Sequence, residues 1–202
     1  MLVFNRKKFF DGYRNRFGTL TQEIVDALEL LLGQIEKDAR FGETEVDRRQ
    51  IAYCLATFKW ETAHSLRPID EFGSAAYFNK RYGPQTKVGK VLGNTKDGDG
   101  ALFHGRGYVQ LTGRRNYAKA KTLTGVDLLA NPDAAKDPPV AYEIAIQGMK
   151  DGWFTGKKLD QFIKPGAADF ENARTIINGH DKAQTIADIA RRFSEVLLEA
   201  TQ

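Results

Sequence analysis

The sequence of 202 residues contains one cysteine, three histidines and no long uninterrupted apolar run. A single cysteine excludes an internal disulfide and a cysteine-rich zinc site. Cys54 lies in the apolar segment 51–58, which predicts a buried thiol that packs as a small hydrophobe. No segment reaches the roughly 18 to 20 apolar residues of a membrane-spanning helix, so we expect no membrane insertion. The N-terminus lacks the apolar segment of a signal peptide, and we therefore expect synthesis in the cytoplasm.

Positive charge exceeds negative charge by a small amount only. Thirty Lys and Arg residues against 26 Asp and Glu residues give a formal net charge of +4. This excess suits an anionic polymer or surface but is too small and dispersed to indicate nucleic acid, so we expect no nucleic-acid partner. Aromatic residues are plentiful, with 13 Phe, 7 Tyr and 2 Trp, and can supply a globular core. The length fits one domain or two small lobes.

The spacing of apolar residues predicts a mainly α chain with a glycine-rich middle. A capping box at Thr19–Gln22 predicts the start of a helix whose apolar stripe runs from Ile24 to Ile35. Further helices are predicted over residues 45–63, 114–124, 140–154 and 182–200. Crowded glycines between residues 72 and 111 predict loops with a small β-hairpin, and Pro165-Gly166 predicts another turn.

Three carboxylates are candidates for acid–base chemistry. Glu61 follows Trp60 at the C-terminal end of a predicted apolar helix, and a partly desolvated carboxylic acid keeps the proton that a general acid needs. Asp70 and Glu71 come after the turn at Pro68, and a turn between acids allows them to face each other across a cleft. Glycoside hydrolysis requires such a pair. The alternative interpretation is that all three are solvated surface charges.

Other chemistries fail on residue spacing. A zinc-protease motif needs histidine directly before Glu61, where Trp60 stands, and a di-iron bundle needs a second Glu-x-x-His. A calcium loop over residues 95–106 would place Thr95 and Arg106 where acids are required. The sequence also lacks a phosphate-binding loop and a nucleophile elbow. We therefore expect neither a metal nor a cofactor.

The segment 103–117 combines flexible backbone with neutral hydrogen-bonding groups and rings. Gly105 and Gly107 permit close approach of the backbone to other groups. Amides and hydroxyls can bind sugar hydroxyls, while aromatic rings can stack on pyranose faces. The residues of this segment that we expect to bind sugar are Tyr108, Gln110, Thr112, Asn116 and Tyr117.

The same segment resembles a family signature. Gly105–Tyr117 is similar to the pattern GRG-x-[IV]-Q-L-[ST]-x-x-x-N-Y of glycoside hydrolase family 19, which comprises plant-type chitinases and phage or prophage endolysins. Residues 125–133 match the family segment GVDLLANPD, and residues 176–179 resemble its I-I-N-G motif. Residues 9–14 and 55–71 resemble the phage-lysin branch. The resemblance covers nearly the whole chain and implies a two-lobed, lysozyme-like helical fold with a substrate cleft.

The resemblance also implies roles for single residues. Glu61 takes the place of the general acid, and Glu71 that of the second carboxylate, with Asp70 as its rival. Gln110, Thr112 and Asn116 match residues that contact sugar and position water, and Asn178 matches the asparagine of the I-I-N-G motif. The family inverts anomeric configuration, which implies carboxyl groups about 6.5 to 9.5 Å apart.

Two positions depart from the family pattern. Trp60 stands where the family commonly has histidine. An acid and an arginine follow the I-I-N-G motif in plant members; Asp181 can take the place of the acid, but Ile189 stands where the arginine is expected. We therefore expect the charges around the general acid to be incomplete.

Our leading hypothesis is an endolysin that cuts the β-1,4 bond between N-acetylmuramic acid and N-acetylglucosamine in peptidoglycan. The phage-branch motifs, the absence of a signal peptide and the absence of disulfides favour it. The alternatives are a chitinase acting on N-acetylglucosamine polymers and a catalytically inactive glycan-binding module. We expect one catalytic domain over residues 1–202 without a separate wall-binding domain, and a monomer. It would act on the periplasmic wall after release from the host cytoplasm, with a holin as an indirect partner.

Overall fold

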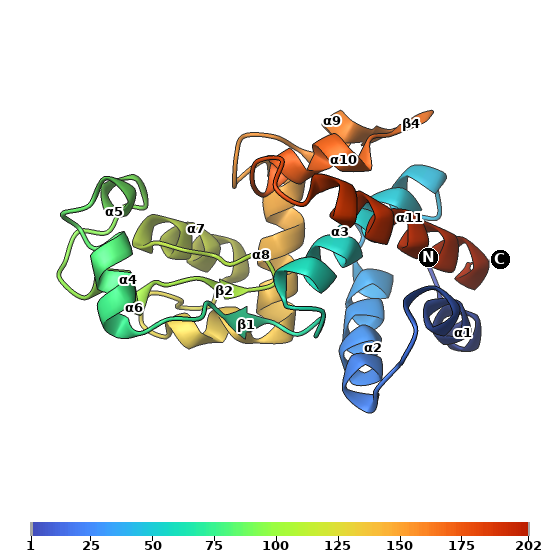
Figure 1. Ribbon diagram of the computed structural model, residues 1–202, viewed down its shortest axis with the longest axis horizontal. Coiled ribbons are helices and arrows are strands. Elements are labelled where there is room, and N and C mark those ends of the chain that lie inside the picture. The colour runs from blue at the N-terminus through green and yellow to red at the C-terminus, as the bar shows by residue number, and fades with distance from the viewer. Residues whose placement is uncertain (1, 202) are drawn as a thin grey trace. The chain divides into compact units, whose positions relative to one another are not determined.

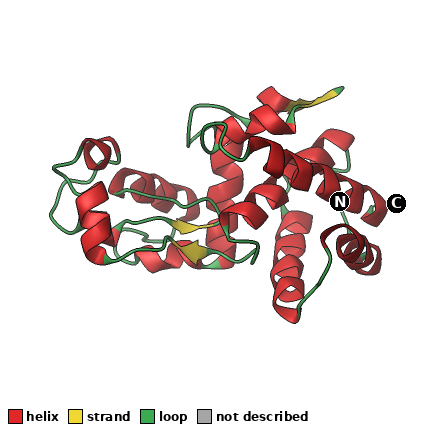
Figure 2. Cartoon of the chain, viewed as in Figure 1, coloured by secondary structure: helices red, strands yellow, loops and turns green. Residues whose placement is uncertain are grey.

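The computed structural model describes residues 2–201 and divides them into two compact units. Unit 1 comprises Met1–Leu66 and Ile146–Gln202, and unit 2 comprises Arg67–Ala145. Helices supply most of the regular structure in each unit, and the strands are short (Figure 2). The predicted mainly α class is thus confirmed.

Unit 1 is built from helices around the long helix α3. Its elements are α1 (Arg6–Phe17), α2 (Gln22–Lys37), α3 (Glu45–Glu61), the end of α8 (Pro138–Asp151), α9 (Leu159–Phe162), β3 (Ile163–Lys164), β4 (Ala167–Ala168), α10 (Phe170–Ala173), η2 (Arg174–Ile176) and α11 (Ala183–Ala200). Helix α11 packs on α3 and α1 (Figure 1). Strands β3 and β4 form a hairpin around the turn predicted at Pro165-Gly166.

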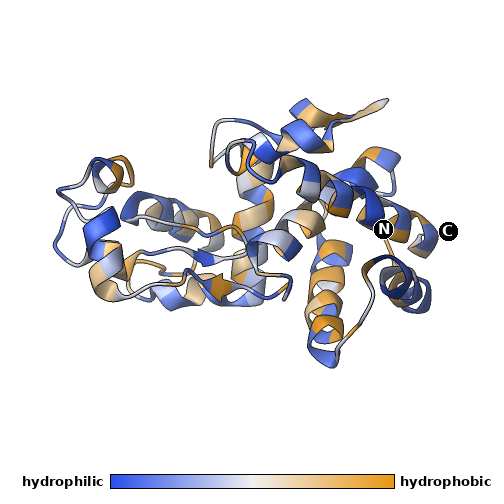
Figure 3. Cartoon of the chain, in the orientation of Figure 1, coloured by the Kyte–Doolittle hydropathy of each residue, from blue (hydrophilic) through white to orange (hydrophobic). Residues whose placement is uncertain are grey.

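Amphipathic helices supply the core of unit 1. Helix α3 is buried from Gln50 to Lys59, and α11 buries a stripe that includes Ile186, Phe193 and Leu197. Apolar and polar residues accordingly share these helices in Figure 3, because each helix turns one face to the core. Cys54 is buried here as predicted, and burial raises the pKa of its thiol to about 12. None of the helices in the described chain is long and apolar enough to span a membrane.

Unit 2 surrounds a smaller core. Its elements are β1 (Ile69–Asp70), α4 (Ala75–Tyr82), α5 (Lys87–Val91), α6 (Asp99–Leu102), β2 (Arg106–Gly107), α7 (Arg114–Thr124), η1 (Pro132–Lys136) and the start of α8. Strands β1 and β2 pair antiparallel, with Ile69 opposite Gly107 and Asp70 opposite Arg106. Phe103, Tyr117 and Leu128 are among the residues of the buried cluster.

Helix boundaries differ from the predictions where capping decides them. Thr21, and not Thr19, caps α2, because its hydroxyl accepts from the Ile24 N–H. Helix α3 ends at Glu61, before the predicted residue 63, because Ala63 and His64 take positive φ angles of 49° and 67°. Helix α8 begins at Pro138 and ends at Asp151, two or three residues earlier than predicted at either end.

The glycine-rich middle contains more helix than predicted. Helices α4, α5 and α6 each span eight residues or fewer, and Ser74 and Thr86 cap the first two. The predicted small hairpin is present as a single bridge, in which Arg106 and Leu111 exchange backbone hydrogen bonds of 3.2 and 2.8 Å. Elements this short carry too few residues for apolar periodicity to be detected.

Hydrogen bonds to the Asp99 carboxylate fix the start of α7. The Asp99 carboxylate accepts from the backbone N–H groups of Thr95 and Lys96 at 2.8 and 3.0 Å. It also accepts from Nε and Nη2 of Arg114 at 2.8 and 2.6 Å. The Arg114 hydrogen bond is the largest influence on the pKa of Asp99, which is lowered to about 2.

Candidate active site

Glu61 in unit 1 is held by a buried arginine. Nη1 of Arg174 donates to Oε1 of Glu61, and the two side chains are 3% and 19% exposed. Nε of Arg174 donates to the Asp181 carbonyl at 3.0 Å, which fixes the plane of the guanidinium. Oε2 of Glu61 has no hydrogen-bond partner among residues 2–201. The carboxyl group is therefore oriented through one oxygen, and the other is available to a substrate.

The local fold around Arg174 also places Asn178. Asp169 caps α10 by accepting from the Asn172 N–H at 3.0 Å, and the chain continues directly into η2, which begins at Arg174. The N–H of Asn178 then donates to the Arg174 carbonyl at 3.1 Å. The side chain of Asn178 is exposed. The I-I-N-G motif therefore lies next to the arginine that holds Glu61.

Arg174 is the site residue that the sequence analysis missed. The arginine was expected after the I-I-N-G motif, at the position of Ile189, but Ile189 is buried in the core face of α11. Arg174 precedes the motif and is the only arginine between residues 115 and 191. Arg174 is the one charged residue of segment 172–179, and this was the available signal, because a buried arginine in an otherwise uncharged segment needs a partner.

Trp60, which stands where the family commonly has histidine, contacts His64. Its indole packs edge-on against the His64 ring, with ring centroids 5.7 Å apart. Successive residues on a helix point in different directions, so Trp60 need not cover the side chain of Glu61. The neighbour shown to hold Glu61 is Arg174.

Glu71 in unit 2 has both carboxylate oxygens engaged. The Tyr82 hydroxyl donates to Oε1 at 2.8 Å, and the Gly105 N–H donates to Oε2 at 3.1 Å. The Glu71 N–H in turn donates to the Gly105 carbonyl at 2.8 Å, which extends the β1–β2 pairing by one residue. The side chain is 21% exposed. Glu71 is therefore a fixed carboxylate that solvent still reaches.

Gly105 brings Gln110 close to Glu71. A Cβ atom at residue 105 would lie 2.8 Å from Oε1 of Gln110 and 3.0 Å from Oε2 of Glu71. Only glycine leaves room for this approach, as the sequence analysis expected for the segment. Gln110 itself has a φ of 56°, a left-handed conformation that is costly outside glycine and is common at functional sites.

Three of the expected sugar-binding residues form one chain of hydrogen bonds. The Thr112 hydroxyl donates to the Gln110 carbonyl at 2.8 Å, and Nδ2 of Asn116 donates to the Thr112 carbonyl at 2.7 Å. All three side chains are half-buried. These contacts orient the segment that carries Gln110 beside Glu71.

Tyr108 and Tyr117 belong to the interior of unit 2. They are 2% and 0% exposed, so neither presents a ring to a ligand at the surface of the unit. The Tyr117 hydroxyl donates to the His104 carbonyl at 2.9 Å and accepts from Nη1 of Arg106 at 3.0 Å. In this chain both rings therefore contribute to packing, and the prediction that they bind sugar is wrong for the surface of the unit.

Asp70 is surrounded by basic side chains. Lys136, His104 and Arg106 approach its carboxylate at 2.6, 3.1 and 3.2 Å. Burial raises the pKa of Asp70, but the hydrogen bonds from Lys136 and His104 outweigh this and hold the pKa below its usual value. These residues and Glu71 line a pocket of about 430 Å³. Residues 2–201 contain no group of three or more acids, histidines or cysteines that could hold a metal ion.

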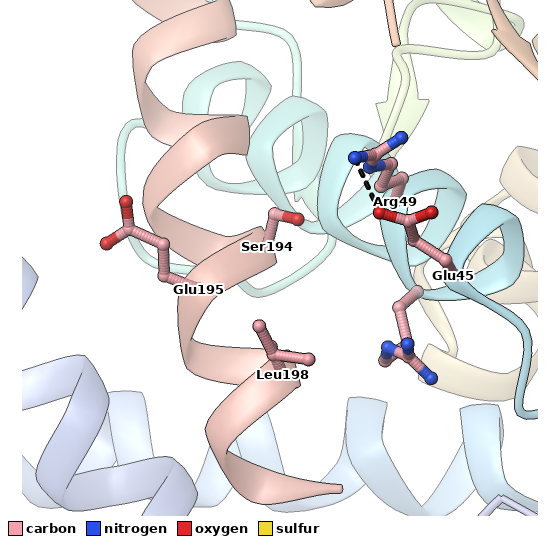
Figure 4. Close-up of a pocket in the computed structure, with 6 residues that line it drawn as sticks. Glu45, Arg49, Ser194, Glu195 and Leu198 are labelled. Atoms are coloured by element: carbon pink, nitrogen blue, oxygen red, sulfur yellow. Dashed lines mark ion pairs between the residues drawn. The ribbon is translucent and has the colours of Figure 1, made fainter. Parts of the chain in front are cut away.

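A smaller pocket of about 180 Å³ in unit 1 contains none of the predicted site residues (Figure 4). It lies between the start of α3 and α11, where Glu45 pairs with Arg49 at 2.6 Å. Glu61 stands at the other end of α3, about 24 Å away along the helix axis at 1.5 Å per residue. This pocket is therefore separate from the candidate catalytic groups.

Comparisons with known proteins show which family the chain belongs to. A family model described as chitinase class I, Glyco_hydro_19, matches residues 34–184. Chitinase 2 of Oryza sativa subsp. japonica is 31% identical over 136 residues, which are 66% of this chain and 38% of that protein. The chain thus spans about two fifths of that relative. Inactive chitinase-like protein 1 of Hevea brasiliensis is 35% identical over 83 residues, 41% of this chain and 24% of that protein. The crystal structure of chitinase C from Streptomyces griseus HUT6037 aligns with a TM-score of 0.63 and 25% identity, covering 99% of this chain and 95% of that one.

Proposed function

Because the chain belongs to glycoside hydrolase family 19, we propose that it hydrolyses β-1,4 bonds in a polymer that contains N-acetylglucosamine. Glu61 is the general acid and Glu71 the general base. The observation that carries the proposal is the state of Glu61: it occupies the family position of the acid, and Arg174 holds one oxygen while the other has no partner among the described residues.

The chemistry uses the two carboxyl groups once each. Glu61 gives its proton to the oxygen of the glycosidic bond as the bond to the anomeric carbon breaks. Glu71 takes a proton from a water molecule whose oxygen forms the new bond to that carbon, on the opposite face of the sugar. Gln110 lies beside Glu71, where its amide can help to orient the water. The product has inverted anomeric configuration.

We assign the base to Glu71 rather than to Asp70. The cations Lys136 and Arg106 lie 2.6 and 3.2 Å from the Asp70 carboxylate, and they stabilise its charge and reduce its tendency to accept a proton. Glu71 accepts from two neutral donors, the Tyr82 hydroxyl and the Gly105 N–H, and the Arg81 guanidinium lies 4.0 Å from Oε1. The cation beside Glu71 is thus farther away than those at Asp70, and we therefore assign the activation of water to Glu71. Asp70 would then anchor the strand that presents Glu71.

Chitin is the substrate that the comparisons favour, since the relatives and the solved structure are named as chitinases or chitinase-like. Peptidoglycan is the second candidate. Segments 9–14 and 55–71 resemble the phage-lysin branch, and the net charge of +4 suits an anionic wall. Both polymers present N-acetylhexosamines in β-1,4 linkage, so the same acid and base serve either one.

The test compares turnover on chitin oligosaccharides and on purified peptidoglycan for the wild type and single variants. Glu61→Gln should lower kcat about 10²–10⁴-fold without lowering Tm, because an amide cannot donate the proton. Glu71→Gln should lower kcat by a similar factor. Asp70→Asn should lower Tm but retain a higher kcat than Glu71→Gln. Glu45→Gln, an exposed position on α3, is the matched control and should remain fully active.

Each outcome assigns or removes a role. Release of reducing ends from only one of the polymers identifies the substrate, and NMR of the first product anomer tests inversion. A larger decrease of kcat in Asp70→Asn than in Glu71→Gln would identify Asp70 as the general base. A folded wild type that binds oligosaccharide but hydrolyses neither polymer would support the inactive glycan-binding module.

A further inference from the structure

Phe72, directly after Glu71, is the most exposed of the large hydrophobic residues that the structure describes. Its exposed fraction is 89%, compared with 67% for Val3 and 61% for Val91. Single apolar residues at a surface are common and usually need no explanation. Phe72 differs because the chain on both sides of it is fixed, and because its neighbour is the carboxylate that we propose as the base.

The residues on either side hold the backbone of Phe72. Before it, Glu71 is tied to Gly105 through its N–H at 2.8 Å and through its carboxylate. After it, a Cβ atom at Gly73 would lie 2.7 Å from Cδ1 of Tyr77 and 2.8 Å from Phe78, so the backbone lies directly on these rings. Ser74 then caps α4 by accepting from the Tyr77 N–H at 3.2 Å. The chain is therefore held on both sides of Phe72.

Nothing in the packing around Phe72 accounts for the exposure of its ring. Glu71 and Gly73 line the pocket of about 430 Å³, but Phe72 between them does not. An aromatic ring in water forgoes the stabilisation that burial of its apolar surface would bring. A rigidly mounted and unburied ring of this kind is suited to a ligand with a flat apolar face.

We propose that Phe72 binds substrate by stacking on the apolar face of an N-acetylhexosamine ring next to the bond that is cut. This inference rests on the proposed function. The Cα atoms of Phe72 and Glu71 are about 3.8 Å apart, as for any two consecutive residues. A sugar held against the ring is therefore adjacent to the base. A phenyl ring has no polar group and binds the C–H face of a pyranose whichever β-1,4-linked N-acetylhexosamine polymer is bound.

Binding is measured without turnover in the Glu61→Gln background, with chitin hexasaccharide and a peptidoglycan-derived oligosaccharide as probes. Adding Phe72→Ala should raise Kd about tenfold, the loss expected when one ring face is no longer covered. Phe72→Trp should keep the affinity, and its indole fluorescence should change on binding when the Glu61→Gln spectrum is subtracted. Val91→Ala, another exposed apolar position in unit 2, is the control and should leave Kd unchanged.

The outcomes separate this inference from the function on which it rests. Unchanged Kd in Phe72→Ala, with the parent variant binding normally, overturns the role of Phe72 and leaves the hydrolase proposal intact. Failure of the parent variant to bind either probe, together with no turnover of either polymer by the wild type, overturns both. In the active enzyme, Phe72→Ala should raise KM and change kcat little. A lowered Tm is not expected, because the ring is almost entirely in solvent.

Discussion

Replacing Asp99 by asparagine should destabilise unit 2 by about 2.5 kcal/mol at neutral pH. The Asp99 carboxylate accepts four hydrogen bonds, two from backbone N–H groups and two from Arg114. These contacts lower its pKa from 3.8 to about 2, and the side chain is only 3% exposed. A shift of this size corresponds to about 2.5 kcal/mol of free energy of unfolding, because one pKa unit is about 1.4 kcal/mol.

The pH dependence follows from the direction of the shift. The folded-state pKa lies below the unfolded value, so the stabilisation is complete above about pH 5 and is lost as pH falls from 3.8 through about 2. Asparagine does not titrate. The difference in unfolding free energy between wild type and Asp99→Asn should therefore shrink steadily as the solution is acidified below about pH 5.

Urea unfolding followed by circular dichroism at pH 7, 5, 4 and 3 measures this difference. Asp97→Asn is the matched control, because Asp97 lies in the same turn and is exposed. The control should lose little stability at any of these pH values. The reasoning is refuted if both variants lose the same amount, or if the loss in Asp99→Asn is the same at pH 3 as at pH 7.

Three further predictions concern other groups. Arg174→Met should lower kcat about 10–100-fold, because the charged hydrogen bond to Glu61 is lost. Arg174→Lys should recover part of the loss, and steady-state kinetics measures both variants. Gln110→Gly should relieve the positive φ and raise the unfolding free energy by about 1 kcal/mol while turnover falls; a loss of stability would contradict the strain argument. Burial lowers the pKa of Lys59 below 10.5, which means that the charged form destabilises the folded state. Lys59→Met should therefore raise the urea midpoint at neutral pH. This gain should shrink as pH rises towards 10.5, because the wild-type lysine then loses its charge. A gain that grows with pH would refute this sign.

Local patterns in the sequence were sufficient for the long helices and for the buried thiol. The predicted ranges 114–124 and 182–200 correspond to α7 and α11 within one residue. An apolar stripe of helical period runs along the whole of α11, whereas α7 buries only Tyr117 and Ala120. The capping box predicted at Thr19 was wrong by two residues, because the hydroxyl that reaches an N–H of the first turn is that of Thr21. Helices α4 to α6 escaped prediction because they are too short for periodicity.

The sequence by itself determined the family, the positions of Glu61, Asp70 and Glu71, and the glycine that admits Gln110 to the neighbourhood of Glu71. Only the tertiary structure decided which side chains bind these carboxylates. Arg174 reaches Glu61 across 113 positions of sequence, and Lys136 reaches Asp70 across 66. It also buried Tyr108 and Tyr117, which local pattern made look like ligand-binding rings. The physical reason is that a hydrogen bond between distant segments depends on how helices and loops pack, and packing has no local signature in the chain.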